Sequence, residues 1–329
     1  MDGQLCAIRQ GDDRVSQYAS AIPEWLSSVV VQQLIDAGLD PARVVAIVQA
    51  TVTEDLAGGV DVTSVATVPA DQVSTVDLVA RQQGVVAGAA IAAAALEVVS
   101  QGRVSVDFLI AEGSAVQPGT VLVSATGPTR DLLTAERTAL NLLGHLSGVA
   151  SITRQWVDAI AGTGAAIRDT RKTTPGLREL EKFAVRCGGG RNHRMSLSDA
   201  ALVKDNHVVA AGGVRQAFEA VRQQWPDLAI EVEVDSLEQL AEVLDAGADL
   251  VLLDNMDPAM TKQAVALTAG RATLESSGGL TLDRARAYAE TGVDYLSVGA
   301  LTHSAPVLDI GGDLRSPQSS TDPATARER

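Results

Sequence analysis

The sequence has few aromatic residues and few cysteines. Aromatic side chains make up 3% of its 329 residues, whereas apolar residues together make up 46%. The core must therefore be built from Ala, Val and Leu, which is typical of α/β layers with helices packed closely on a sheet. Two cysteines, Cys6 and Cys187, cannot form a disulfide framework, and the charged first twenty residues contain no apolar run typical of a signal peptide. We therefore expect a cytoplasmic α/β protein in which Cys187 is an inert thiol.

Basic charge and long hydrophobic runs are also lacking. The chain has 26 Lys and Arg against 41 Asp and Glu, a formal net charge of −15. This balance argues against a general nucleic-acid binder or a protein held on anionic lipid, because both need an excess of positive charge. The most apolar stretch, residues 85–99, is too short to cross a bilayer and predicts a buried helix. We therefore expect neither nucleic acid nor a membrane as a partner.

Local composition divides the chain into parts. Residues 1–22 predict a flexible N-terminal extension, and residues 315–329, rich in Ser, Thr, Pro and charge, predict a disordered tail. Between them, residues 23–140 predict an N-terminal α/β sandwich-like domain, which we expect residues 304–314 to complete. The spacing of apolar residues predicts helices at 23–35, 41–56 and 131–146, and strands at 73–81, 104–111 and 121–126.

Residues 141–303 alternate between β-type runs and helical segments. The predicted strands are 165–169, 201–204, 230–234, 250–253, 272–274 and 295–298. The predicted helices between the later strands are 237–246, 259–268 and 282–291. Strands alternating with helices at this spacing predict a parallel sheet with right-handed crossovers. Six units in sequence favour an abbreviated, about six-stranded parallel α/β barrel as the catalytic domain, with an open doubly wound sheet as the alternative.

Polar residues follow every one of these six strands. Barrel enzymes carry their reactive groups at the C-terminal ends of the strands. The third strand alternates Glu231, Glu233 and Asp235, which places all three on one face. The other five strands are followed by polar segments at 169–172, 204–207, 254–255, 275–279 and 297–299. A purely structural barrel would not need polar groups at all six ends, so we predict a functional site there.

The insertion between the first two strands is strongly basic. Residues 168–194 hold eight Lys and Arg against three acids, a local excess of five positive charges in an acidic chain. Arginine suits a two-point grip on carboxylate or phosphate. Arg171, Lys172, His193 and Arg194 lie beside a strand end or a turn, and they predict an anion-binding site. Helical spacing instead predicts a solvent-exposed face with ion pairs for Arg178, Glu179, Glu181 and Lys182.

Two other groups point to phosphate and metal. Residues 276–279, Ser-Ser-Gly-Gly before a predicted helix, are typical of a turn whose backbone N–H groups face an anion. Residues 297–299 follow the last strand, and late strand ends commonly hold phosphate in barrels. Glu233 and Asp254 offer carboxylate oxygens, which favour Mg²⁺ over zinc, held directly or through water. The alternative is that these two carboxylates partner the arginines. The sequence has no motif typical of a covalent nucleophile.

The longest of these motifs carry a resemblance to a known family. They are Asp-Thr-Arg-Lys-Thr-Thr-Pro-Gly-Leu-Arg at 169–178, Glu-Lys-Phe-Ala-Val-Arg-Cys-Gly-Gly-Gly at 181–190, Asn-His-Arg at 192–194 and Lys-Asp-Asn-His at 204–207. The sequence here closely resembles nicotinate-nucleotide pyrophosphorylase (carboxylating), also named quinolinate phosphoribosyltransferase. The resemblance covers about residues 25–312 in order, with shorter motifs at 136–141, 147–148, 231–234, 253–255, 275–279 and 292–299.

The resemblance implies an activity. The family joins quinolinate to phosphoribosyl pyrophosphate, releases pyrophosphate and CO₂, and makes nicotinate mononucleotide for NAD biosynthesis. It therefore implies a pentosyltransferase that uses Mg²⁺ and forms a homodimer or a higher homo-oligomer. The positive charge of residues 168–194 independently agrees with these two substrates, because a pyridine dicarboxylate and a polyphosphate sugar both need cations.

The resemblance also assigns residues to the substrates. Lys172 would lie at the reacting centre, and Arg137 would reach the neighbouring subunit's site. Glu233 and Asp254 would face Mg²⁺ and the ribose hydroxyls and would stabilise positive charge on the ribose. Quinolinate would be held by Arg171, His193, Arg194 and Lys204, with Thr170 as a further substrate contact. The 5′-phosphate would be held by Ser276, Ser277, Gly278, Gly279, Ser297, Val298 and Gly299.

Other functions fit parts of the sequence. A related phosphoribosyltransferase of the same fold would use a different anionic ring, and a ring with one carboxylate would need fewer cations. A phosphate-ligand sensor would bind phosphoribosyl pyrophosphate without releasing pyrophosphate. A structural barrel with a basic interaction face is the third alternative, and the clustering of polar residues at the strand ends argues against it.

Overall fold

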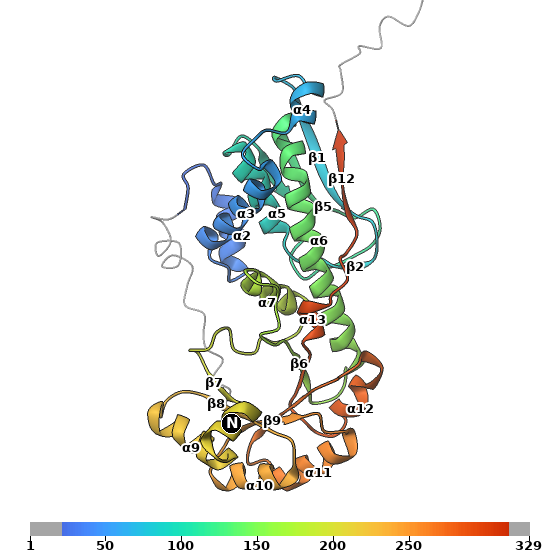
Figure 1. The fold of residues 1–329 in the computed structure, drawn as a ribbon. Helices are drawn as coiled ribbons and strands as arrows, with labels where there is room; N and C mark the ends of the chain where they lie inside the picture. The colour runs from blue at the N-terminus through green and yellow to red at the C-terminus, as the bar shows by residue number, and fades with distance from the viewer. Residues whose placement is uncertain (1–21, 316–329) are drawn as a thin grey trace, which may run out of the picture. The chain divides into compact units, whose positions relative to one another are not determined.

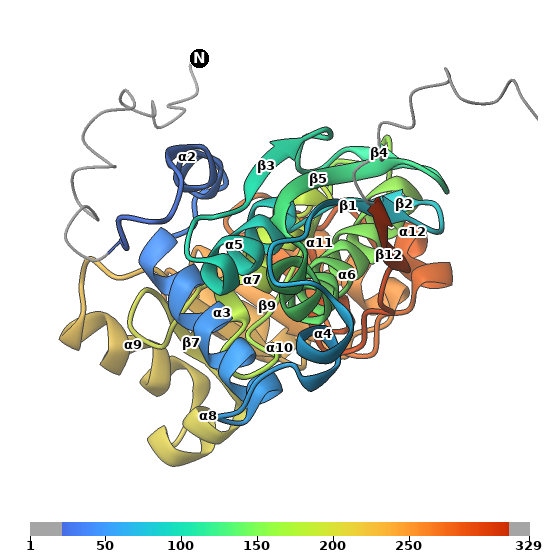
Figure 2. The same cartoon turned by 90° about the horizontal axis from the view of Figure 1, so that it is seen from above.

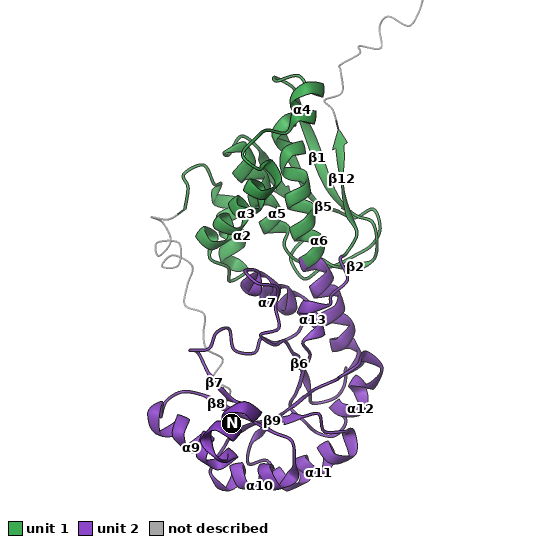
Figure 3. Cartoon of the chain, viewed as in Figure 1, with its two compact units in different colours: residues 1–145, 308–329 green, residues 146–307 purple. Residues whose placement is uncertain are grey.

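The computed structural model describes residues 22–315 (Figure 1). The predicted extension at 1–22 and the predicted tail at 315–329 thus lie outside the described residues, except for residues 22 and 315. The chain divides into two compact units, residues 1–145 with 308–329 and residues 146–307 (Figure 3). We predicted boundaries near 140 and 303 from the sequence. The first observed boundary falls inside one continuous helix, α6 (Thr129–Ala159), where no loop marks it.

The first unit contains a four-stranded antiparallel sheet in the order β12-β1-β5-β3. Its last strand along the chain, β12, pairs with β1 from Thr75↔Arg315 to Ala80↔Ile310, so a C-terminal segment completes the N-terminal sheet. A second, two-stranded sheet pairs β2 with β4. The strands are β1 (Val73–Ala80), β2 (Gly84–Val85), β3 (Ser105–Phe108), β4 (Ala115–Val116), β5 (Val121–Pro128) and β12 (Ile310–Arg315).

Small residues let the helices of this unit pack closely on the sheet. Helix α5 (Ala89–Ser100) is alanine-rich and buried along most of its length, and it contacts both β5 and α3 (Pro41–Leu56) (Figure 2). Ser27 is the N-cap of helix α2 (Ser28–Asp36). Its backbone N–H and its hydroxyl donate to the buried carboxylate of Glu97 on α5 at 2.7 and 2.6 Å. The short helix α4 (Val62–Thr67) was not predicted.

Helix α6 extends further than the predicted 131–146. Its C-terminal half contains Ser, Thr, Gly and Val, which have low intrinsic helix propensity. Burial compensates for this low propensity, since Val149, Ala150 and Trp156 are buried. The Thr153 hydroxyl donates to the Val149 carbonyl one turn earlier at 2.7 Å, which satisfies a polar group in a buried position.

The second unit contains a six-stranded parallel sheet in the order β6-β11-β10-β9-β8-β7. All six predicted strands are present, and the predicted N-terminal α/β domain with an abbreviated barrel is confirmed. The strands are β6 (Ala166–Arg168), β7 (Ala201–Val203), β8 (Ile230–Val234), β9 (Leu250–Asp254), β10 (Thr273–Ser277) and β11 (Tyr295–Ser297). The helices that follow them along the outer side are α9 (Val214–Gln224), α10 (Leu237–Asp245), α11 (Pro258–Thr268), the short η1 (Leu282–Arg284) and α12 (Ala285–Ala289).

The barrel is open between β6 and β7, which form the two edges of the sheet. The basic insertion 169–200 connects these edges and carries α7 (Arg178–Cys187). Its segment around Arg191 pairs with β6, because the Arg191 N–H donates to the Ile167 carbonyl at 2.8 Å and its carbonyl accepts from the Asp169 N–H at 3.0 Å. The insertion therefore satisfies one exposed strand edge and lies where the barrel fails to close.

Two short helices follow strand ends of this unit, α8 (Asp205–Ala211) after β7 and α13 (Ala300–His303) after β11. Across residues 22–315, none of the helices is both long and apolar enough to cross a lipid bilayer.

Candidate active site

A cavity of about 630 Å³ lies at the carboxyl ends of the parallel strands in the second unit. All six strand ends contribute to it, as predicted from the polar residues that follow each strand. Twelve predicted site residues line it: Thr170, Arg171, Lys172, His193, Arg194, Lys204, Glu233, Asp254, Ser277, Gly278, Gly279 and Ser297. Five further residues line it that were not assigned a role from the sequence: Leu202, Asp205, Leu252, Asn255 and Glu275.

Four predicted residues do not line this cavity. Ser276 is fully buried, because alternation along β10 directs its neighbours Glu275 and Ser277 into the cavity. Val298 is also buried. Gly299 leaves room for Lys172, since a Cβ at this position would lie 2.9 Å from the Lys172 Cδ. Arg137 lies on α6 in the first unit. Of the three alternating acids at 231, 233 and 235, Glu233 lines the cavity and Glu231 is buried, whereas Asp235, which follows β8, is exposed and lines an adjacent, smaller cavity.

Two arginines in the cavity have unsatisfied donors. The Nε atoms of Arg171 and Arg194 are buried and have no hydrogen-bond partner among the described residues. Burial and the nearby positive charge of Arg171 lower the pKa of Arg194. Placing two guanidinium groups close together is unfavourable unless an anion joins them. This pair therefore indicates a site for an anionic ligand.

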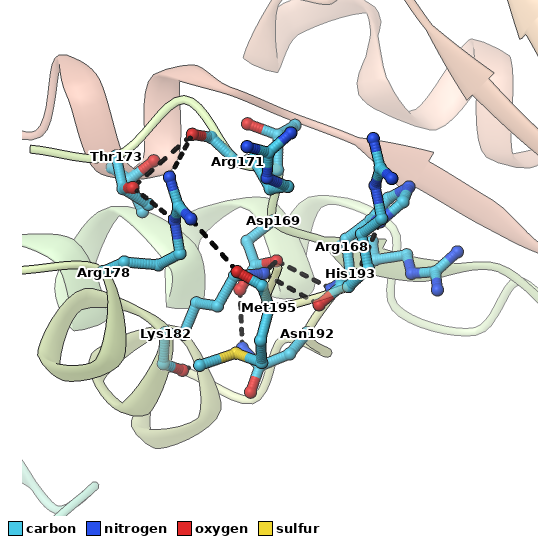
Figure 4. A network of polar contacts seen from close by, with 12 residues as sticks. Arg168, Asp169, Arg171, Thr173, Arg178, Lys182, Asn192, His193 and Met195 are labelled. Atoms are coloured by element: carbon cyan, nitrogen blue, oxygen red, sulfur yellow. Dashed lines mark hydrogen bonds and ion pairs between the residues drawn. The ribbon is translucent and has the colours of Figure 1, made fainter. Parts of the chain in front are cut away.

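The predicted solvent-exposed face of α7 is wrong, because Lys182 and Glu181 are fully buried. Figure 4 shows Lys182 beside Asp169. The Lys182 ammonium contacts the buried Asp169 carboxylate and donates to the His193 carbonyl at 2.8 Å. Asp169 also accepts from the His193 N–H at 2.7 Å and from the Asn192 side chain at 2.6 Å. Burial lowers the pKa of Lys182, and the Asp169 charge opposes that effect. This network joins the end of β6 to the segment that carries His193.

Arg178, also predicted as part of an exposed face, holds the loop that contains Arg171 and Lys172. Its guanidinium donates to the Thr173 hydroxyl at 3.0 Å and to the Met195 carbonyl at 3.1 Å (Figure 4). Arg178 thus binds other residues of the same insertion. The helical spacing around Arg178 could not predict these hydrogen bonds, because their acceptors, the Thr173 hydroxyl and the Met195 carbonyl, lie in loops outside the helix.

His193 has both ring nitrogens close to protein atoms. Its Nδ1 accepts a hydrogen bond from the Arg194 backbone N–H at 2.7 Å, so the ring proton must be on Nε2. Nε2 lies 2.7 Å from the Glu231 carboxylate and 3.6 Å from the Glu275 carboxylate. His193 is therefore oriented by its neighbours, and its Nε2–H faces two buried carboxyl groups.

Two acidic side chains that line the cavity, Glu233 and Asp254, lie near one lysine, Lys204. The Lys204 ammonium lies 2.6 Å from Glu233 Oε2. Burial and the Glu233 charge raise the pKa of Asp254, whose carboxylate accepts from the Asn255 side chain at 2.6 Å. Two carboxylates that share one ammonium leave negative charge unbalanced. Hard oxygen donors in this setting fit Mg²⁺, held directly or through water.

The fold and the site together define a class: an α/β-barrel enzyme for small anionic, phosphorylated substrates. The family follows from comparison with known proteins. The chain matches the family models described as "Quinolinate phosphoribosyl transferase, N-terminal domain" over residues 61–147 and "Quinolinate phosphoribosyl transferase, C-terminal domain" over residues 149–313. It belongs to the quinolinate phosphoribosyl transferase family.

Individual relatives are similar to this chain over most of their length. The chain is 51% identical over 285 residues to the nicotinate-nucleotide pyrophosphorylase [carboxylating] of Mycobacterium leprae, covering 85% of this chain and 100% of that protein. It is 38% identical to the chloroplastic enzyme of that name from Arabidopsis thaliana, covering 80% and 81%. The solved structure of NadC from Streptococcus pyogenes superposes with a TM-score of 0.81 at 37% identity, covering 85% of this chain and 99% of that one.

Proposed function

We propose that this protein is a quinolinate phosphoribosyltransferase that makes nicotinate mononucleotide, pyrophosphate and CO₂ from quinolinate and phosphoribosyl pyrophosphate in NAD biosynthesis. The observation that carries the proposal is the cavity at the strand ends. One of its walls holds Arg171, Arg194 and Lys172, and the other holds Glu233 and Asp254. A cationic wall suits a dicarboxylate ring, and an acidic wall suits a ribose with its metal ion.

Quinolinate would bind at the cationic wall. The unsatisfied Nε atoms of Arg171 and Arg194 supply donors for its two carboxylates, and Lys204, which lies beside Glu233 in the same cavity, adds a third cation. Leu202 and Leu252 give the cavity apolar surface for the pyridine ring. His193 would contact the ring by its carbon edge, since both of its nitrogens face protein atoms. The family resemblance implies that His193 holds quinolinate, and we propose this carbon-edge contact as the form of that role.

Phosphoribosyl pyrophosphate would bind across the acidic wall and the glycine turn. Gly278 and Gly279 have φ values of +90° and +58°, and Ser277 and Ser297 lie beside them. Such a turn offers backbone N–H groups to the 5′-phosphate. Glu233 and Asp254 would hold Mg²⁺, and the bound ion would supply positive charge to offset that of the departing pyrophosphate.

The residues of the cavity act by orientation and electrostatics. As the bond to pyrophosphate breaks, positive charge builds on the ribose, and the carboxylates of Glu233 and Asp254 stabilise it. Arg171 and Arg194 hold the ring so that its nitrogen faces the anomeric carbon. Lys172, which also lines the cavity, offsets negative charge at the reacting centre. The nitrogen then carries positive charge, which draws electrons from the neighbouring ring carbon and lets its carboxylate leave as CO₂.

The direct test is a reaction of the purified protein with quinolinate, phosphoribosyl pyrophosphate and Mg²⁺, followed by chromatography. We expect nicotinate mononucleotide and pyrophosphate in equal amounts. Nicotinate in place of quinolinate serves as the control, and we expect little product from it because it lacks one of the two carboxylates. Faster turnover of nicotinate would identify the related phosphoribosyltransferase instead, and pyrophosphate release from neither ring would favour a sensor.

Replacing Gly278 with alanine should weaken the use of phosphoribosyl pyrophosphate more than the same change at Gly279. A Cβ at position 278 would lie 2.2 Å from the Asn255 Oδ1, whereas at position 279 no heavy atom lies within 4 Å. Both positions have positive φ, so both variants carry the same kind of backbone strain, about 1–2 kcal/mol. We expect Gly278→Ala to raise the KM about tenfold beyond Gly279→Ala, equivalent to about 1.4 kcal/mol. Equal KM values would contradict the turn as a phosphate site.

We also propose that the enzyme is a cytoplasmic homodimer or higher homo-oligomer in which Arg137 completes a neighbouring subunit's site. The family resemblance supports this role for Arg137. Arg137→Ala and Lys172→Ala should each be inactive alone and should regain activity when mixed, because a mixed oligomer contains some sites with neither change. Subunit exchange is verified by a mass difference between labelled chains. Verified exchange without recovered activity would count against shared sites.

A further inference from the structure

A second polar cluster lies beneath the cavity, inside the barrel. It consists of the carboxyl groups of Glu231 on β8 and Glu275 on β10, the guanidinium of Arg168 on β6, and the His193 ring. The exposed fraction of the side chain is 2% for Glu231 and 0% for Glu275. Only Glu275 and His193 of this cluster also line the cavity. Nothing in the reaction steps described above uses Glu275.

The cluster has one fixed positive charge for two carboxyl groups. The Arg168 guanidinium lies 2.6 Å from Glu275 Oε2 and 3.8 Å from Glu231 Oε1. His193 adds no charge, because its Nδ1 accepts an N–H and its single ring proton is on Nε2. If both glutamates were ionised, the buried cluster would carry a net negative charge, which is costly at this depth.

A bound proton removes this imbalance, whereas a metal ion does not fit. His193, Glu231 and Glu275 place one potential ligand atom each within 4.8 Å of one another, a spacing that a metal ion would allow. However, a protonated Nε2 has no lone pair to offer a metal. Oε1 of Glu275 is buried without a hydrogen-bond partner among the described residues. Burial and the Glu231 charge raise the pKa of Glu275, whereas a charge on His193, the charge of Arg168 and the Ser297 hydroxyl lower it and oppose this only in part. The hydrogen bond that His193 Nδ1 accepts leaves the ring neutral and removes the first of these opposing effects.

We propose that Glu275 is a protonated carboxylic acid in the floor of the cavity and donates its proton to the ring carbon from which CO₂ leaves. The step rests on the proposed function. The bond between ring carbon and carboxylate breaks, and its electron pair stays on the ring carbon beside the positively charged nitrogen. That pair takes the proton of Glu275, which forms the new C–H bond. Glu275 is left as a carboxylate and regains a proton from water after the product leaves.

Arg168 and Glu231 act as positioning residues in this account. Arg168 holds Oε2 of Glu275, which leaves Oε1 without a hydrogen-bond partner among the described residues. Glu231 supplies the negative charge that keeps the proton on Glu275. Both lie away from the cavity lining, so neither reaches the substrate directly.

The test is a single-turnover reaction of Glu275→Gln with both substrates and Mg²⁺, quenched over time and analysed for three species. Gln has the size of Glu but cannot donate this proton. We expect pyrophosphate release near the wild-type rate, accumulation of phosphoribosylated quinolinate, and nicotinate mononucleotide formation slowed about 10²-fold or more. Nicotinate mononucleotide at the wild-type rate, or equal slowing of both steps, would overturn the proposal. Absence of pyrophosphate release in the wild type would instead overturn the proposed function.

Glu231→Gln is the matched variant, with the same change in the same cluster but outside the cavity. Removing the Glu231 charge lowers the pKa of Glu275, so the loss of product formation at high pH should begin at a lower pH than in the wild type. An unchanged pH profile would contradict the role of Glu231. The wild type provides a check that needs no variant: its infrared spectrum at neutral pH should contain a carboxylic-acid C=O band from a buried group that resists exchange. A spectrum without such a band would overturn the proposal.

Discussion

Replacing Arg171 with alanine should lower kcat/KM for quinolinate by about 10- to 100-fold, since a hydrogen bond to a charged group contributes about 1.5–3 kcal/mol. Arg171 lines the cavity, and its buried Nε has no partner among the described residues. Truncation therefore removes a donor for the substrate and disrupts few contacts within the protein. The KM for phosphoribosyl pyrophosphate should stay within about twofold of wild type, because that substrate binds the opposite wall. Steady-state kinetics with each substrate varied in turn measure both quantities.

Arg191→Ala is the matched control for this prediction. Arg191 belongs to the same basic insertion but is exposed and does not line the cavity. If the general positive charge of the insertion attracts quinolinate, both variants should lose activity to a similar degree. If the cavity binds it specifically, Arg191→Ala should behave like the wild type. Wild-type kinetics for Arg171→Ala would overturn the assignment of the cationic wall.

Replacing Lys182 with methionine should cost about 3–5 kcal/mol of unfolding free energy in the second unit, because the change leaves a buried charge without a partner. Asp169 has no exposed surface, and Lys182 is the cation that contacts its carboxylate. Chemical denaturation followed by tryptophan fluorescence measures the loss, since the buried Trp156 lies in this unit.

The double variant Lys182→Met, Asp169→Asn provides the control for this effect. It removes both charges, so it should recover part of the lost stability even though it removes more polar groups. Its activity should stay low, because the side chain of Asn has one acceptor oxygen and cannot accept from both the His193 N–H and the Asn192 amide, as Asp169 does. A single variant within about 1 kcal/mol of wild type would show that the pair is not a buried ion pair in solution.

The barrel was predictable because its strands follow simple rules. The segment 230–234 alternates apolar residues with glutamates, and the observed β8 has the same bounds. The polar residues after each strand share one edge because parallel strands have the same direction, which is why twelve predicted residues meet in one cavity. The positive charge of the insertion pointed to Arg171 and Arg194 as anion-binding residues, and the family resemblance assigned them to quinolinate.

The buried polar groups were not predictable in the same way. The spacing of Glu181 and Lys182 fits an exposed helix. That the Lys182 ammonium binds Asp169 and the His193 carbonyl in the interior cannot be inferred from this spacing. Glu275 stands beside residues that were assigned to phosphate, and its place in a cluster depends on side chains from three other segments of the chain. Whether such a polar side chain is buried depends on partners far away in the sequence, whereas hydrophobic periodicity gives information about one helix or strand at a time.

The most direct measurement of the central claim is a crystal structure of the protein with quinolinate and an unreactive phosphoribosyl pyrophosphate analogue bound together. We predict that the quinolinate carboxylates contact Arg171, Arg194 and Lys204, with the 5′-phosphate at Gly278 and Gly279. The ring nitrogen should face the anomeric carbon. Electron density for both ligands at another place, with these three cationic side chains touching neither, would contradict the account.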